Sequence, residues 1–222
     1  MDFSAVFQTW LNAVTQPNEE FYDNERKSPN ATLGTAIIWI VIAAIISAIV
    51  GVIGIFIGFG ALSGSGIFDE ILSDPEISSE VRVVMEAFLS GGGFAGLAGA
   101  GLVASIIFAP IGFLIGVGIL HLIARLLGGQ GDFGRYAYLN AAFQAPIQIV
   151  TSVLGLIPFL GGCVSFLLAL YSLVLVYFAT KTEHQLSQGR SIMVLLIPLI
   201  IGILLSACIV LAFISLAIPQ FQ

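Results

Sequence analysis

The chain has 222 residues, of which 58% are apolar and only 9% are charged, and its formal net charge is −6. Soluble globular domains carry about 25% charged residues, so this composition excludes a soluble globule and predicts an integral membrane protein. Thirteen acidic side chains against seven basic ones leave no basic face of the kind that nucleic-acid binding requires. The expected partner is therefore the lipid bilayer, and no nucleic-acid partner is expected.

Charged residues are clustered and leave long uncharged runs, at residues 33–60, 94–120, 136–180 and 191–222. Each run can hold at least one membrane span of about 20 residues. The run 136–180 is long enough for two spans and divides at Pro158. We therefore predict an all-α, polytopic membrane protein, with a single domain over residues 1–222 and a bundle of five transmembrane helices at about 33–60, 101–124, 136–157, 159–180 and 192–217.

An amphipathic helix is predicted before the first span, over residues 3–14. Its apolar side chains recur at helical spacing, at Phe3, Val6, Phe7, Trp10, Leu11 and Val14. The helix is too short and too polar to span a membrane. Either it lies in the membrane interface with Trp10 at the level of the lipid head groups, or it packs on the cytosolic side of the protein itself.

An acidic external loop that carries a short amphipathic helix is predicted over residues 61–93, between the first and second spans. It carries six acidic residues against the single base Arg82. Just before it, Gly54 and Gly58 form a GxxxG pair, a spacing that lets helix backbones approach closely. This face favours a membrane-protein partner or self-association.

The distribution of basic residues predicts the orientation in the membrane. With five spans, one side receives six of the seven Lys and Arg residues and the other receives only Arg82. Because basic loops remain in the cytoplasm, the N-terminus is expected in the cytoplasm and the C-terminus outside. The six are Arg26, Lys27, Arg125, Arg135, Lys181 and Arg190.

The polar residues most typical of a site lie at the turn between the second and third spans. His121 and Arg125 are four residues apart, so they share one helix face. Gly128 and Gly129 are natural C-cap residues, and Asp132 is placed to cap the third span and to pair with Arg125 or Arg135. A tight, anchored turn explains these residues without any chemical activity.

An amide stripe follows on the third span, where Asn140, Gln144 and Gln148 repeat every four residues. Amides at membrane depth need hydrogen-bond partners. Two interpretations are open. The stripe bonds to polar groups of other helices, with Ser105, Ser152, Ser165 and Tyr171 as candidates, or it lines a polar permeation path.

Motifs of catalysis are missing from the sequence. No Asp, Glu or Lys lies inside a predicted span, and there is no nucleotide-binding lysine loop, HExxH or GxSxG. His121, Asp132, Glu183 and His184 are candidates to converge at the cytosolic side, but their spacing is not that of a metal site. We expect no metal, no cofactor and no enzymatic activity.

Several motifs along the chain resemble the Yip domain family of five-span membrane proteins, whose name denotes interaction with Ypt and Rab GTPases. The most specific is the His-x-x-x-Arg-x-x-Gly-Gly turn that begins at His121. The others are Trp10 with Pro17 and Phe21, Phe133, Pro146, Pro158 with Gly161, and His184 with Leu186 and Ser187. The resemblance covers nearly the whole chain and implies the five-span plan.

The resemblance also implies a non-enzymatic scaffold or interaction protein of the membrane. Eukaryotic members associate with prenylated small GTPases, but their cytosolic N-terminal regions are longer than the roughly thirty residues that precede the first span here. A prokaryotic member in the cytoplasmic membrane is the expectation. The alternative function is transport of a small solute or lipid along Asn140, Gln144 and Gln148.

Overall fold

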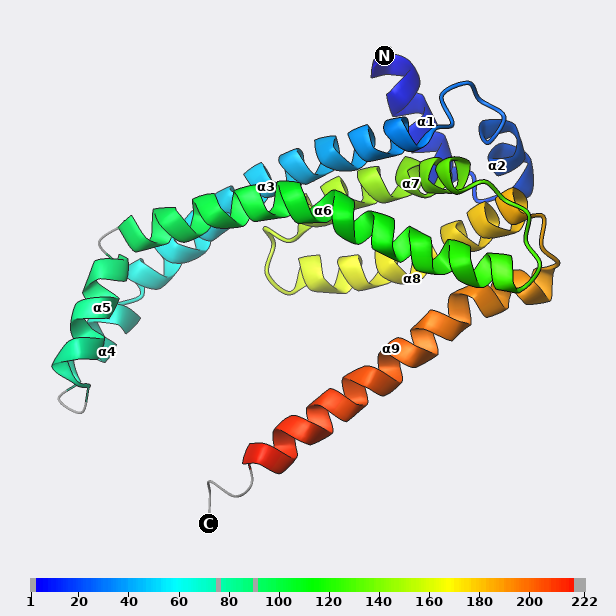
Figure 1. Ribbon diagram of the computed structural model, residues 1–222. Helices are drawn as coiled ribbons and strands as arrows, with labels where there is room; N and C mark the ends of the chain where they lie inside the picture. Colours follow the sequence, from blue (N-terminus) through cyan, green and yellow to red (C-terminus); the bar gives the residue numbers. More distant parts are fainter. Residues whose placement is uncertain (1–2, 75–76, 90–91, 218–222) are drawn as a thin grey trace. The chain divides into compact units, whose positions relative to one another are not determined.

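The computed structural model describes residues 3–74, 77–89 and 92–217, and every regular element in these residues is an α-helix (Figure 1). This confirms the predicted all-α class and the N-terminal helix. In chain order the helices are α1 (Phe3–Thr15), α2 (Glu19–Glu25), α3 (Leu33–Gly64), α4 (Ile67–Ser73), α5 (Ser79–Leu89), α6 (Gly92–Leu126), α7 (Phe133–Leu154), α8 (Leu160–His184) and α9 (Gln188–Ala217).

Four helical segments of the described chain are long and apolar enough to cross a membrane. They are Leu33–Gly64, Ala98–Leu126, Leu160–His184 and Gln188–Leu211. A chain with four such segments is a multi-pass membrane protein, as the composition predicted. Helix α7 is not among the four, so the fifth span stays a prediction.

Helix α7 is less apolar than its neighbours because its first half is enclosed by protein. Every residue from Tyr136 to Phe143 is buried, all the way around the helix. Three of these are alanines, at 137, 141 and 142, whose small side chains allow neighbouring backbones to approach. A helix covered on all sides gains nothing from an apolar surface toward lipid, which explains the Asn and Tyr residues in this segment.

Two helices extend beyond the predicted limits of their spans. Helix α3 continues to Gly64 instead of Gly60, and α6 begins at Gly92 instead of near Gly101. At about 1.5 Å per residue these helices measure roughly 48 and 52 Å, well beyond a hydrocarbon core of about 30 Å. The thickness of a bilayer therefore does not set where they end, and much of the predicted loop 61–93 is helical.

The chain divides into two compact units. Unit 1 comprises Met1–Ala36, Leu114–Phe143 and Tyr171–Gln222, and unit 2 comprises Ile37–Phe113 and Gln144–Leu170. In unit 2, Ser47 Oγ donates to the Gln148 carbonyl at 3.4 Å. A Cβ on Gly54 would lie 2.9 Å from Leu156 Cδ2, so this glycine permits a close contact, whereas one on Gly58 would meet nothing within 4 Å among the described residues.

In unit 1 the N-terminal helices are fixed by tyrosine hydroxyls. Tyr22 of α2 is fully buried and donates to the Ala13 carbonyl at 3.0 Å, and Tyr171 of α8 donates to the Val14 carbonyl at 2.6 Å. Burial raises the pKa of the Tyr22 hydroxyl well above its usual range, which keeps it protonated as a donor. Tyr138 of α7 adds a hydrogen bond to the Glu25 carboxylate.

Replacing Tyr22 by phenylalanine tests this attachment. Tyr22→Phe leaves the Ala13 carbonyl without its donor, so we expect a loss of about 1 kcal/mol in unfolding free energy and faster amide exchange in α1 and α2. Thermal unfolding in detergent and hydrogen exchange measure the two effects. Unchanged exchange in both helices would contradict the assigned role of the hydroxyl.

Candidate functional site

The turn between α6 and α7 is built from two cap motifs that the sequence predicted. Helix α6 ends in a Schellman motif, in which the N–H of Gly129 bonds to the Ala124 carbonyl at 2.9 Å and the N–H of Gly128 to the Arg125 carbonyl at 3.0 Å. Gly128 has φ +93°, a left-handed conformation that favours glycine. Asp132 caps α7, because its Oδ1 accepts from the Arg135 N–H at 3.0 Å.

A buried carboxylate ties this turn to the end of α8. The side chain of Glu183 is fully buried, and its Oε1 accepts from the Asp132 N–H at 2.7 Å and from Arg135 Nε at 3.1 Å. The sequence predicted that Arg135 or Arg125 pairs with Asp132, and that prediction was wrong. The Oδ1 atom of Asp132 caps α7, and the Arg135 guanidinium pairs instead with the Glu183 carboxylate of α8.

Two histidines from α6 and α8 meet beside this carboxylate. His184 Nε2 lies 2.9 Å from His121 Nδ1, so one imidazole donates to the other. The His184 ring packs edge-on against Tyr136 with centroids 4.6 Å apart, and the His121 ring packs against Phe133 at 5.4 Å. The Tyr136 hydroxyl bonds in turn to Thr180 Oγ1 at 2.8 Å, so the rings join α6, α7 and α8.

Glycines allow the turn to lie directly against α8. A Cβ on Gly129 would lie 2.8 Å from His184 Cβ, and one on Gly131 would lie 2.9 Å from the Glu183 carbonyl oxygen. Between them, the Gln130 N–H donates to the His184 carbonyl at 3.2 Å. We use the name polar junction for His121, Gly128–Asp132, Arg135, Glu183 and His184.

Half of the polar residues predicted as candidates for a site belong to the polar junction. The eight candidates are His121, Arg125, Asp132, Arg135, Asn140, Gln144, Gln148 and His184. His121, Asp132, Arg135 and His184 come together there. Arg125 is exposed in the last turn of α6 and has no ion-pair partner among the described residues. There its charge favours the negative end of the helix dipole, as the sequence indicated.

The amide stripe does not join the polar junction. Asn140 is fully buried and donates through Nδ2 to the Tyr136 carbonyl of its own helix at 2.8 Å. Gln144 and Gln148 are half-buried in unit 2. Of the polar partners that the sequence suggested, Ser105, Ser152 and Tyr171 all donate to backbone carbonyls. The three amides are not among the residues that line the pocket between α2 and α8 or the groove between α8 and α9 in unit 1.

Glu183 is the central residue of the polar junction, and the sequence singled it out only as one of four candidates to converge at the cytosolic side, with His121, Asp132 and His184. In the sequence Glu183 is distinctive because it is the only Asp or Glu after Asp132. Its position at the end of an apolar segment suggested a loop residue, whereas the carboxylate is buried. Within the described residues, no group of three or more His, Cys, Asp and Glu is arranged to hold a metal ion. The polar junction is thus a network of hydrogen bonds and ring contacts that joins three helices, in which Glu183 Oε2 and His184 Nδ1 are buried without a hydrogen-bond partner among the described atoms.

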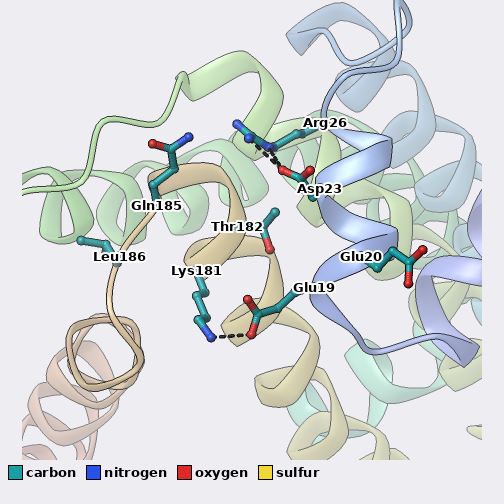
Figure 2. Close-up of a pocket in the computed structure, with 8 residues that line it drawn as sticks. All are labelled: Glu19, Glu20, Asp23, Arg26, Lys181, Thr182, Gln185 and Leu186. Carbon is teal, nitrogen blue, oxygen red and sulfur yellow. Dashed lines mark hydrogen bonds and ion pairs between the residues drawn. The ribbon is translucent and has the colours of Figure 1, made fainter.

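A polar pocket of about 480 Å³ lies between α2 and the end of α8 in unit 1. Figure 2 shows two ion pairs on its walls, Lys181 with Glu19 and Arg26 with Asp23, and in this view the Thr182 side chain lies between them. The Glu20 carboxylate points away from both pairs. The lining residues are Glu19, Glu20, Asp23, Arg26, Lys181, Thr182, Gln185 and Leu186.

A methyl group at Gly131 tests the close approach of the turn to α8. Gly131→Ala places Cβ against a backbone oxygen, so we expect a loss of about 1–3 kcal/mol in unfolding free energy. Gly189→Ala is the matched control, because a Cβ there meets nothing within 4 Å, and alanine favours a helix by up to about 1 kcal/mol. Thermal unfolding of both variants should separate them; equal stability would show that the turn does not need the glycine.

Removing the charge of Glu183 tests the buried carboxylate. Glu183→Gln weakens two hydrogen bonds in a buried setting, and we expect a loss of about 2 kcal/mol in unfolding free energy. Glu86→Gln, at an exposed position of α5, is the control and should leave stability unchanged. If the two variants unfold at the same temperature, the carboxylate does not hold the polar junction together.

Comparison with known proteins agrees with this architecture at the level of the family. Neither the curated proteins nor the solved structures gave a significant match to the chain. The family model described as the Yip1 domain matches residues 11–209. This match includes the polar junction and every helix except the first part of α1 and the end of α9. The chain therefore belongs to the Yip1 domain family.

Proposed function

We propose that this membrane protein is a non-enzymatic scaffold or interaction protein, and that its contact surface is the polar end of unit 1. By the polar end we mean α1, α2, the turn 127–132 and the loop 185–187. The observation that carries the proposal is that hydrogen bonds and ion pairs between distant parts of the chain fix these segments to one another.

Side chains of α7 and α8 make the contacts that hold α1 and α2 in place. Tyr171 of α8 holds α1, Tyr138 of α7 holds α2, and Lys181 of α8 pairs with Glu19 of α2. The polar junction holds the turn. A surface that is already ordered loses little conformational freedom when a partner binds, which suits a binding platform.

Basic residues support a cytoplasmic location for this end. All six Lys and Arg residues that the five-span arrangement places on one side belong to unit 1, whereas Arg82 belongs to unit 2. The positive-inside rule then puts the N-terminus in the cytoplasm and, with five spans, the C-terminus outside. For a prokaryotic chain, the membrane in question is the cytoplasmic membrane.

Helix α1 adds an apolar row to the polar end. Phe3, Phe7 and Leu11 occur every fourth residue and are 81%, 66% and 51% exposed. The C-terminal end of the helix is attached through the backbone carbonyls of Ala13 and Val14. The row is therefore free to contact a partner or the lipid interface. A membrane protein or a second copy of this chain is the proposed partner.

Photo-crosslinking tests the location of the contact surface. Benzoyl-phenylalanine in place of Phe7 or Gln130 should give discrete protein adducts in intact membranes, because both side chains are exposed at the polar end. The matched control replaces Phe213, an exposed phenylalanine of α9, and should give no protein adduct. Mass spectrometry of each adduct identifies the partner.

Two results would contradict the proposal. One is the absence of protein adducts from Phe7 and Gln130 together with a monomeric state in mild detergent. The other is a protein adduct formed only through Phe213, which would move the contact surface to α9.

A further inference from the structure

An apolar groove lies between α8 and α9 within unit 1. It has a volume of about 390 Å³, and its walls are almost entirely apolar. Residues that line it include Leu173, Val174 and Tyr177 of α8 and Ile192, Leu196 and Leu199 of α9. Volumes of this size are typical of sites for small amphipathic molecules.

The groove leads along α8 to the polar pocket. Leu173 and Tyr177 line the groove, while Lys181 and Gln185 line the pocket. Leu173, Tyr177 and Lys181 are spaced by four, so they lie on one face of α8, and Gln185 follows directly after the end of the helix. Lys181 Nζ lies 5.9 Å from the centroid of the Tyr177 ring, which joins the two regions. From Leu173 to Lys181 the helix rises about 12 Å.

This order of side chains matches the order of groups in a membrane lipid. Lys181 lies in the last turns of α8, at the end of a segment apolar enough to span the membrane. Lysines at such positions lie at the level of the lipid head groups. An acyl chain that starts beside Lys181 and follows the groove therefore runs along the apolar part of the helix.

The charges of the pocket favour a zwitterionic head group that carries a primary amine. The Lys181–Glu19 pair is partly exposed, with side-chain exposures of 23% and 55%. A phosphate oxygen can accept from Lys181 while an ammonium group donates to Glu19. Three carboxylates against two bases disfavour an anionic head group.

From these observations we propose that unit 1 binds one phospholipid with an ethanolamine head group, its head in the polar pocket and one acyl chain in the α8–α9 groove. This inference goes beyond the proposed function and does not depend on a protein partner. A choline head group has the same net charge but no N–H donor, so it satisfies the Glu19 carboxylate less well.

Native mass spectrometry of the full chain tests the proposal, with phosphatidylethanolamine, phosphatidylcholine and phosphatidylglycerol at equal concentrations in mixed micelles. We expect one retained phosphatidylethanolamine, with a preference of roughly tenfold over phosphatidylglycerol and a smaller preference over phosphatidylcholine. Equal retention of the three lipids, or a preference for either comparison lipid, would overturn the proposal.

Two variants with matched controls test the two halves of the site. Lys181→Ala should reduce retention roughly tenfold, whereas Lys27→Ala, which removes another acid-paired lysine outside the pocket, should not. Leu196→Trp should fill the groove and reduce retention, whereas Leu204→Trp, an exposed α9 position outside the groove, should not.

Gel filtration and thermal unfolding establish that each variant is folded. If Lys181→Ala does not fold, Leu196→Trp still decides the outcome. A variant that retains the lipid as well as its control overturns the site. The photo-crosslinking result at Phe7 and Gln130 is measured separately, so a failure of lipid binding leaves the proposed protein contact standing, and the reverse also holds.

Discussion

The buried carboxylate of Glu183 is the constraint on which the described arrangement of unit 1 depends. A carboxylate taken out of water is costly unless hydrogen-bond donors reach it, and here the donors to Glu183 Oε1 come from Asp132 in the α6–α7 turn and from Arg135 in the first turn of α7. The turn must therefore lie against the end of α8. The Schellman motif at Gly128 and the cap at Asp132 then set where α6 ends and where α7 begins.

This constraint explains why the helix joined to the turn has an unusual composition. Helix α7 starts at the polar junction and is enclosed at once, from Tyr136 to Phe143. The hydroxyls of Tyr136 and Tyr138 and the Asn140 amide nitrogen bond inside the protein, to Thr180, Glu25 and the helix's own backbone. Asn140 Oδ1 is buried without a hydrogen-bond partner among the described atoms. A hydropathy criterion measures how well a segment suits lipid, and most of this segment does not meet lipid. Four of the described helices satisfy the criterion and α7 does not, for this physical reason.

The sequence predicted well those features that local chemistry determines. The caps at Gly128, Gly129 and Asp132 follow from conformational freedom and side-chain length over a few residues, and the structure has them as expected. The pairing of Arg135 with Glu183 could not be predicted in the same way, because the two residues are 48 positions apart and their meeting depends on the packing of α8. Helices α3 and α6 extend beyond the predicted spans because bilayer thickness limits the part of a helix that crosses the membrane and not the helix itself.

The separations in sequence across the polar end have a consequence for biosynthesis. The α6 and α7 residues of the polar junction find their partners 48 to 63 residues further along the chain, in Glu183 and His184. The partner of Glu19 is synthesised later still, because Lys181 follows it by 162 residues. Most of the chain must therefore leave the ribosome before the N-terminal helices can reach their final positions. Until then, α1 and α2 lack the contacts that Tyr171, Tyr138 and Lys181 make with them in the folded chain.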